Sequence, residues 1–138
     1  MSLSFRVTDA PDDRIAAVGA ALTAFNEADV GPKDHRPLAV IAEDGGALVA
    51  GLSGSTSWGW LYVQWLWVDE ARRGAGLAGA LLERAEAEAR ARGCKGANID
   101  CFNPVARRAY ARQGYEVFGE IPDFVAGRSR WFLSKRWG

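Results

Sequence analysis

The stretch from Trp60 to Gly93 constrains the fold most, because three kinds of segment follow one another without a break. A nearly continuous apolar run, WLYVQWLWV, is typical of a strand that is covered on both faces. Two arginines and then three glycines within six residues come next, followed by a charged helix that ends at Gly93. This order predicts a β–α unit whose helix begins at a glycine-rich turn.

The N-terminus of this helix predicts an anion site. The first N–H groups of a helix lack intrahelical partners and carry a partial positive charge. Glycines let a ligand approach the backbone, and Arg72 and Arg73 add full charges beside it. A phosphate or pyrophosphate is the most natural ligand. A tight turn with two solvated arginines is the plainer alternative.

A dinucleotide site competes with this interpretation. The spacing Gly74-x-Gly76-x-x-Gly79 fits the dinucleotide pattern, and Asp100 lies near the distance expected for a ribose-binding acid. Against it, DEARR separates the strand from the glycines, and too little chain follows for a doubly wound sheet. A Walker-type loop is excluded, because no Gly-Lys-Ser/Thr occurs.

The remaining patterns predict one α/β domain of the α+β type over residues 1–138. We expect a mixed sheet of six to seven strands with helices on both faces. The predicted strands are Ser4–Thr8, a hairpin over 38–58 that turns at Asp44-Gly45-Gly46, then 60–68, 95–102, 115–121 and 129–137.

Three helices are expected between these strands. The first runs over 9–30 with Asp9 as cap and Pro11 in its first turn, and faces the core with Ile15, Val18, Leu22 and Phe25. The second buries Leu77, Leu81, Ala85 and Ala89, while Glu86–Arg90 and Glu88–Arg92 pair on its solvent side. The third starts at the cap Asn103 and ends at Gly114.

Composition narrows the function classes. Seventeen basic residues balance seventeen acidic ones, which leaves no electrostatic footprint for nucleic acid. Cys94 and Cys101 fit no metal or disulfide framework, and we expect reduced thiols and no metal. No signal peptide or membrane-spanning run is evident, so the expected compartment is the cytoplasm, without membrane partners.

Two motifs in series resemble those of the GNAT superfamily of acyl-CoA-dependent N-acyltransferases. The first is Arg73-x-x-Gly76-x-Ala78, and the second is Asn103-x-x-Ala106-x-x-x-Tyr110-x-x-x-Gly114-Tyr115. Together they cover about Tyr62 to Gly119. The chain also resembles a bacterial subgroup of uncharacterised acetyltransferases through LWVDE and the tail FGEIPDFVAGRSRWFLSKRW. It departs from that subgroup at Gln64 and at Gly127-Arg128, where an acid and Gly-His are usual.

The resemblance implies direct transfer of an acetyl group from acetyl-CoA to a primary amine in a ternary complex. Tyr110 is the implied proton donor to the leaving thiolate, and a backbone N–H near Trp67 or Val68 polarises the thioester carbonyl. The implied cofactor-binding residues are Leu66, Trp67, Val68, Arg73, Gly74, Ala75, Gly76, Leu77, Ala78, Asn103, Ala106 and Tyr110, with Arg72 as a further candidate.

The general base and the acceptor stay open. Candidates for the base are Glu43, Asp100, His35, Asp69 and water held by Tyr62. The acceptor is a small molecule or a protein amine, and use of longer acyl-CoAs is undecided. Alternation places Trp58, Trp60 and Tyr62 on one face and Trp65 and Trp67 on the other.

One alternative function and one expectation about assembly remain. The alternative function is a CoA-binding sensor or interaction module without turnover, supported by the lack of an evident base. Family members often form homodimers through sheet edges or C-terminal strands, so a homodimer is also an expectation. Trp131, Phe132 and Trp137 either take part in that interface or belong to the core.

Overall fold

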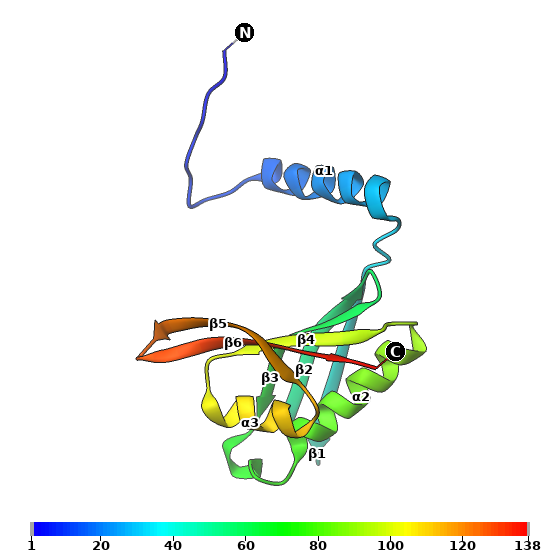
Figure 1. Ribbon diagram of the computed structural model, residues 1–138, viewed down its shortest axis with the longest axis vertical. Coiled ribbons are helices and arrows are strands. Elements are labelled where there is room, and N and C mark those ends of the chain that lie inside the picture. The colour runs from blue at the N-terminus through cyan, green and yellow to red at the C-terminus, as the bar shows by residue number, and fades with distance from the viewer. Residues whose placement is uncertain (1, 138) are drawn as a thin grey trace. The chain divides into compact units, whose positions relative to one another are not determined.

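The computed structural model describes residues 2–137 and divides into two compact units, Met1–Lys33 and Asp34–Gly138, which are described separately (Figure 1). The second unit holds the sheet, two α-helices and both motifs. That the two units form one GNAT domain over residues 1–138 stays a prediction.

The first unit contains α1 (Asp13–Val30), which residues without regular secondary structure precede. The predicted strand Ser4–Thr8 is wrong, since no described residue forms a ladder with it. The predicted cap Asp9 is also wrong. Asp12 is the N-cap, because its side chain accepts a hydrogen bond from the Arg14 N–H at 3.0 Å.

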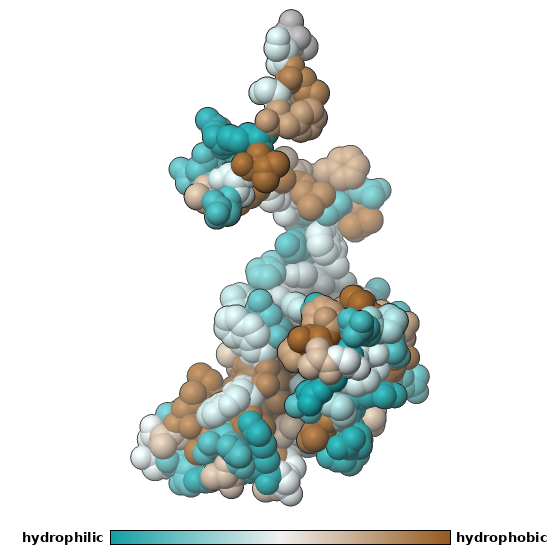
Figure 2. All heavy atoms as spheres, turned by 90° about the vertical axis from the view of Figure 1, so that its left-hand side faces the viewer, coloured by the Kyte–Doolittle hydropathy of each residue, from teal (hydrophilic) through white to brown (hydrophobic). Residues whose placement is uncertain are grey.

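The apolar residues of α1 are exposed. Ile15, Val18, Leu22 and Phe25 keep 58–71% of their surface accessible, and Figure 2 shows apolar atoms on the surface of this unit. The prediction that these four residues face the core is therefore not confirmed by the structure.

The second unit is a six-stranded mixed sheet in the order β1-β2-β3-β4-β6-β5. Its strands are β1 (Arg36–Asp44), β2 (Ala47–Ser57), β3 (Trp60–Val68), β4 (Gly96–Cys101), β5 (Glu116–Val125) and β6 (Arg128–Arg136). Only the β3–β4 pair is parallel. The predicted fold class, α/β with a mixed sheet of six to seven strands, is confirmed with six strands.

Two α-helices, α2 (Leu77–Ala91) and α3 (Pro104–Arg112), pack on one side of the sheet, below it in Figure 1. We call this side the helix face and the opposite side the distal face. A helix on the distal face stays a prediction. The short 3₁₀ helix η1 (Glu70–Arg72) connects β3 to the glycine-rich turn.

The predicted turn and cap residues occupy their expected places. Gly45 and Gly46 both have positive φ in the tight β1–β2 turn, as hairpin turns of this length require. Gly93 follows α2 with φ +82°, and Asn103 caps α3 with Pro104 at its first position. The β5–β6 hairpin is longer than predicted, because Ala126 and Gly127 turn it tightly with positive φ.

The core lies between the sheet and the two helices. The predicted stripe of α2 is confirmed, with Leu81, Ala85 and Ala89 buried and Leu77 packed against them. Trp131 is buried in the same core, and the Trp137 Nε1–H donates to the Cys94 carbonyl at 2.8 Å. These two tryptophans are therefore accounted for within the unit.

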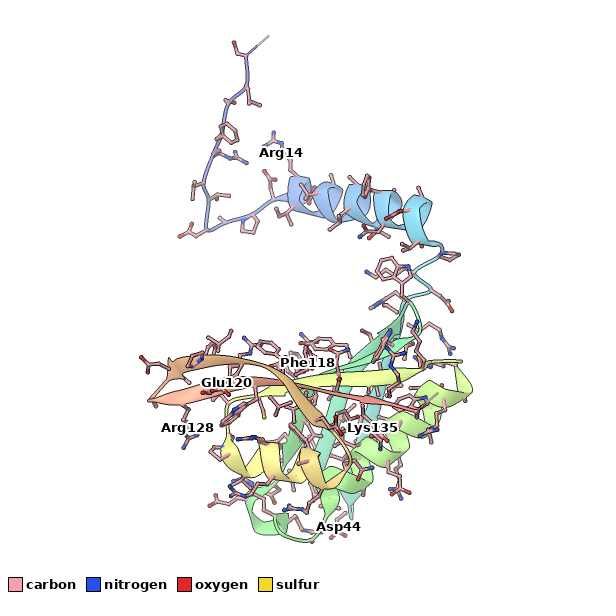
Figure 3. The ribbon with its side chains drawn as sticks, in the orientation of Figure 1. Arg14, Asp44, Phe118, Glu120, Arg128 and Lys135 are labelled. Atoms are coloured by element: carbon pink, nitrogen blue, oxygen red, sulfur yellow. The ribbon has the colours of Figure 1, made fainter. Side chains whose placement is uncertain are left out.

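Glu86 is buried, which contradicts its predicted place on the solvent side of α2. Its carboxylate accepts hydrogen bonds from Lys135 Nζ at 2.7 Å and from the Tyr115 hydroxyl at 2.9 Å. Figure 3 shows Lys135 on the helix face, as this contact requires. The predicted pair Glu88–Arg92 is confirmed at 2.7 Å.

A bulge in β3 changes which side chains share a face. Ser53 pairs with Trp65 and Gly54 pairs with Val63, so Gln64 is an extra residue on β3. Leu61, Val63, Leu66 and Val68 consequently pack toward the core, whereas Tyr62, Trp65 and Trp67 are 40–67% exposed. The prediction that Trp65 and Trp67 oppose Tyr62 is wrong, because the bulge shifts the alternation by one residue.

Replacing Gly54 with alanine should destabilise the protein by about 3 kcal/mol, the upper end for an overpacked site. A Cβ at Gly54 would collide with the backbone carbonyl oxygen of Tyr62, which cannot move without disturbing the bulge. Gly51→Ala on the same strand is the matched control, since its Cβ would meet only the Val40 oxygen at an ordinary 3.5 Å. Urea unfolding of both variants measures the difference, and equal midpoints would contradict the proposed role of Gly54.

Candidate active site

The parallel strands β3 and β4 are paired over only part of their length. Their register runs from Trp60 opposite Gly96 to Val63 opposite Ile99 and then stops. Beyond this point β3 continues to Val68 paired with β2, and β4 continues to Cys101 paired with β6. The two strands therefore diverge, and over Leu66–Val68 the edge of β3 that faces away from β2 has no partner strand among residues 2–137.

Both functional motifs follow this divergence. The carboxyl ends of parallel strands lie at the same edge of a sheet. β3 leads into η1 and the glycine-rich turn, while β4 leads into Asn103 and α3. Figure 1 shows this turn and α3 at the same end of the unit. The fold therefore brings the two motifs together.

The glycine-rich turn leaves the start of α2 open. Gly74 and Gly76 have φ of +84° and +79°, and a Cβ built at either position meets nothing within 4 Å. The first helical hydrogen bond runs from the Ala80 N–H to the Gly76 carbonyl. The N–H groups of Leu77 and Ala78 thus have no intrahelical acceptor, which gives this end of α2 its partial positive charge.

The two arginines before the turn are held differently. The Arg73 Nε–H donates to the Val68 carbonyl at 3.2 Å, which holds this guanidinium at the end of β3. Arg72 forms an ion pair with Asp44 at 2.6 Å, and both side chains are substantially exposed. Figure 3 shows Asp44 at the same end of the unit as the turn.

Asn103 and Ala106 lie on the first turn of α3. The Asn103 Oδ1 accepts from the Val105 N–H at 2.8 Å and from the Ala106 N–H at 3.4 Å, so its predicted capping role is confirmed. Ala106 is half-buried against the core. The helix they begin follows β4 after a short connection, at the end where the strands diverge.

Tyr110 is buried on α3, with 5% of its surface accessible. Its ring meets that of Tyr115 edge-on, with centroids 6.5 Å apart. Burial raises the pKa of its phenol well above the ordinary value, and nearby Cys101 and Asp100 raise it further. The phenol consequently keeps its proton through the neutral range, so it can act there as a proton donor but not as a phenolate base.

Cys101 ends β4 beside Tyr110. Its pKa is raised by burial, an effect that a hydrogen bond from the Asn103 backbone partly opposes. A thiol held neutral in this way is a packing group and not a nucleophile.

The proposed bases lie in different parts of the sheet. Asp100 is the first residue of β4 beyond the parallel pairs, at the divergence. Asp69 braces the start of η1, since its backbone N–H donates to Val49 and its carbonyl accepts from Arg72. Glu43 is exposed on the edge strand β1, and two strands, β2 and β3, lie between it and β4. His35 precedes β1 and contacts the Ser57 hydroxyl at 2.8 Å, near the opposite end of β3.

Two side chains at this end of the sheet were missed by sequence reasoning. Asp44 was assigned only to a turn, although it pairs with Arg72. Arg130 pairs with Asp100 at 2.9 Å, and no local pattern signals a contact between residues 30 positions apart. Alternation with the buried Trp131 was the available signal, because it places Arg130 on the distal face.

Gly79 has a packing role that accounts for the third glycine of the dinucleotide pattern. A Cβ there would lie 3.2 Å from the Gln113 side-chain oxygen at the end of α3. Within residues 2–137, no helix is long and apolar enough to cross a bilayer, and no cluster of three or more His, Cys, Asp or Glu side chains is present.

The family model described as the Acetyltransferase (GNAT) family matches residues 9–115. Acetyltransferase Atu2258 of Agrobacterium fabrum is 43% identical over 136 residues, which cover 97% of this chain and 99% of that protein. Blasticidin-S acetyltransferase of Streptomyces morookaense is 42% identical over 107 residues, with 74% and 79% coverage.

Solved structures share the fold. A crystal structure described as an acetyltransferase from Agrobacterium tumefaciens has a TM-score of 0.90 and 42% identity, covering 98% of this chain and 100% of that one. A streptothricin acetyltransferase structure from Bacillus anthracis, in complex with acetyl coenzyme A, has a TM-score of 0.66 at 15% identity, with 73% and 62% coverage. The family match over residues 9–115 and the relatives that cover nearly the whole chain show that the chain is an N-acetyltransferase that belongs to the GNAT family.

Proposed function

We propose that the protein transfers the acetyl group of acetyl-CoA to a primary amine by direct attack in a ternary complex. The observation that carries this proposal is the divergence of β3 and β4 directly before both motifs. The divergence leaves one edge of β3 open, and the two segments that follow it carry the open start of α2 and the buried Tyr110 phenol. The acetyl-CoA bound to the Bacillus anthracis acetyltransferase of the same fold supports the choice of cofactor.

The turn from Gly74 to Ala78 is proposed to bind the pyrophosphate. Its backbone N–H groups point out of a helix start that no side chain caps. The absence of side chains at Gly74 and Gly76 leaves room for the phosphates. Arg73 adds a full positive charge. Arg72 adds a second one if its guanidinium leaves Asp44 or binds the phosphate and Asp44 at the same time.

The amide-bearing arm of the cofactor is proposed to pair with the open edge of β3 over Leu66–Val68. Peptide-like amides can add to a strand edge as an extra strand does. Asn103 and Ala106 border the arm from α3. A backbone N–H of Trp67 or Val68 then donates to the thioester carbonyl, where negative charge develops in the transition state.

The chemical step forms one bond and breaks another. The neutral amine attacks the thioester carbon, the C–N bond forms and the C–S bond breaks. The leaving thiolate takes a proton from the Tyr110 hydroxyl or is stabilised by its hydrogen bond. The amine loses its extra proton to a base or to water, and Asp100 is the carboxylate nearest to the divergence in sequence.

Replacing Tyr110 with phenylalanine should lower kcat by about 100-fold, the lower range for general acid catalysis, and leave acetyl-CoA affinity nearly unchanged. The change removes one hydroxyl from a buried ring and keeps its volume. The test is steady-state release of CoA thiol together with calorimetric titration.

Tyr115→Phe is the matched control, because Tyr115 is equally buried and lies beside Tyr110, but its hydroxyl binds Glu86. It should lower stability and leave kcat within about twofold, as expected for a group that does not act in the transition state. If both variants turn over at the parental rate, Tyr110 is a packing residue and the acid lies elsewhere.

The acceptor is proposed to be a small molecule. The named activity of the Streptomyces relative concerns blasticidin S, a small molecule, and this relative aligns with 74% of the chain. The first experiment is titration with acetyl-CoA, CoA and NADPH in parallel, followed by an amine screen with thiol detection. Acetyl-CoA binding without thiol release from any amine would identify a binding module instead.

A further inference from the structure

The distal face of the sheet carries an ion pair at the point where β3 and β4 diverge. Asn98 and Asp100 alternate with the buried Ala97, Ile99 and Cys101, so the Asp100 carboxylate lies on the distal face. Tyr110 lies on the helix face, in the core. A thioester held in the divergence therefore has the phenol on one side and Asp100 on the other.

Arg130 on β6 completes this pair. Its Nη2 donates to the Asp100 Oδ1 at 2.9 Å, and both side chains are partly buried, with 33% and 22% accessible. The guanidinium carbon lies 5.3 Å and 5.2 Å from the ring centroids of Phe124 and Phe132. Two aromatic faces thus hold the guanidinium in place.

The hydrogen bonding of Arg130 is incomplete. Its Nε is buried and has no partner, and it is the one buried side-chain nitrogen or oxygen of this kind within residues 2–137. Because the protein itself shields this nitrogen, a ligand from outside the chain would meet the Nη1 group, which has no hydrogen bond to residues 2–137 and is not among the buried unpaired atoms. A guanidinium binds planar carboxylates best, because its donors match the two oxygens.

We propose that the acceptor is a small amino acid-like molecule, with a carboxylate next to the reacting amine. The proposal rests on the acetyl transfer proposed above and names its substrate class. Arg130 binds the acceptor carboxylate through the accessible Nη1 end of its guanidinium, and Asp100 binds the amine beside the thioester. Two adjacent opposite charges on the protein complement the two adjacent opposite charges of a zwitterion. Phe102 and Phe124, with ring centroids 5.7 Å apart, provide an apolar wall for the acceptor side chain.

The test compares amino acids with the amines that lack only the carboxylate, such as phenylalanine with phenethylamine. Thiol release is measured over a panel of such pairs at saturating acetyl-CoA. The best amino acid should exceed its decarboxylated partner by at least about 10-fold in kcat/KM, the value of one hydrogen bond to a charged group. Arg130→Gln should raise KM for the amino acid by about 10- to 100-fold, and this rise should exceed the change for the amine, which still depends on the Asp100 that Arg130 holds.

Arg136→Gln is the matched control on the same strand and face, where Arg136 stacks on Trp60 with its guanidinium carbon 5.0 Å from the ring centroid. Arg136→Gln should leave KM unchanged for both the amino acid and the amine. Arg130→Lys should keep part of the preference for the amino acid that Arg130→Gln loses. Titration of the CoA-bound protein with phenylalanine gives a readout that does not need turnover. Loss of that binding in Arg130→Gln, with binding kept in Arg136→Gln, is the expected result.

Two outcomes overturn the inference in different ways. If amines without a carboxylate react as well as amino acids, or if Arg130→Gln affects both equally, the substrate class is wrong and acetyl transfer stands. If acetyl-CoA binds and no amine of either kind releases thiol, the proposed acetyl transfer fails and the substrate class fails with it.

Discussion

Arg73→Ala combined with Gly76→Asp should raise the dissociation constant for acetyl-CoA by about 100-fold. Removing the guanidinium and adding a carboxylate at the helix end should each cost about 10-fold, the usual size of one charged hydrogen bond. Gly76 is the N-cap of α2, and a side chain there enters the open space in front of the turn. Calorimetric titration measures the change, and thermal unfolding checks that the fold is kept.

The chain offers a closely matched control in the β5–β6 turn. Gly127 also has a positive φ, of +71°, with open space around it, and Arg128 follows it directly (Figure 3). Gly127→Asp with Arg128→Ala therefore makes the same changes in charge and backbone strain away from the motifs. If both double variants bind acetyl-CoA as tightly as the parent protein does, the Gly74–Ala78 turn does not bind the phosphates.

Glu86→Ala should cost about 3–5 kcal/mol of unfolding free energy, the usual result of removing one partner of a buried ion pair. The Glu86 side chain is 6% accessible, and its loss leaves the Lys135 ammonium and the Tyr115 hydroxyl without their shared acceptor. Burial and the Glu86 carboxylate also hold the pKa of the Tyr115 phenol well above its ordinary value, so this phenol donates throughout the neutral range.

Glu88→Ala is the control for this variant. It removes an ion pair of the same 2.7 Å length from the same helix, but Glu88 is 49% accessible. The expected loss is below about 1 kcal/mol. Urea unfolding of both variants compares the two pairs directly, and similar losses would show that burial of Glu86 does not set its contribution.

Local patterns predicted the elements whose signals lie within one segment. The bounds of β3, the buried stripe of α2 and the capping role of Asn103 were all predicted because period, turn residues and cap chemistry agree there. The resemblance to the GNAT motifs added the prediction that the glycine-rich turn binds the cofactor, since the glycine spacing alone fits both a phosphate and a dinucleotide.

Long-range contacts account for what could not be predicted. Glu86 seemed to pair with Arg90 four residues away, yet its partners are 29 and 49 residues distant. The bulge at Gln64 depends on Gly54 in the neighbouring strand, and it moved Trp65 and Trp67 to the face of Tyr62. Similarly, the unpaired Nε of Arg130 becomes evident only when three strands are assembled.

The short parallel register between β3 and β4 makes the stability of the sheet centre depend on what binds beside it. Four residue pairs join two antiparallel halves of the sheet, β1-β2-β3 and β4-β6-β5. Under the proposed binding mode, the arm of acetyl-CoA continues this seam as a removable strand. The bound cofactor then stabilises the folded sheet as well as supplying the acetyl group. Each release of CoA leaves this edge of β3 unpaired again, so the stability of the sheet centre changes during the catalytic cycle.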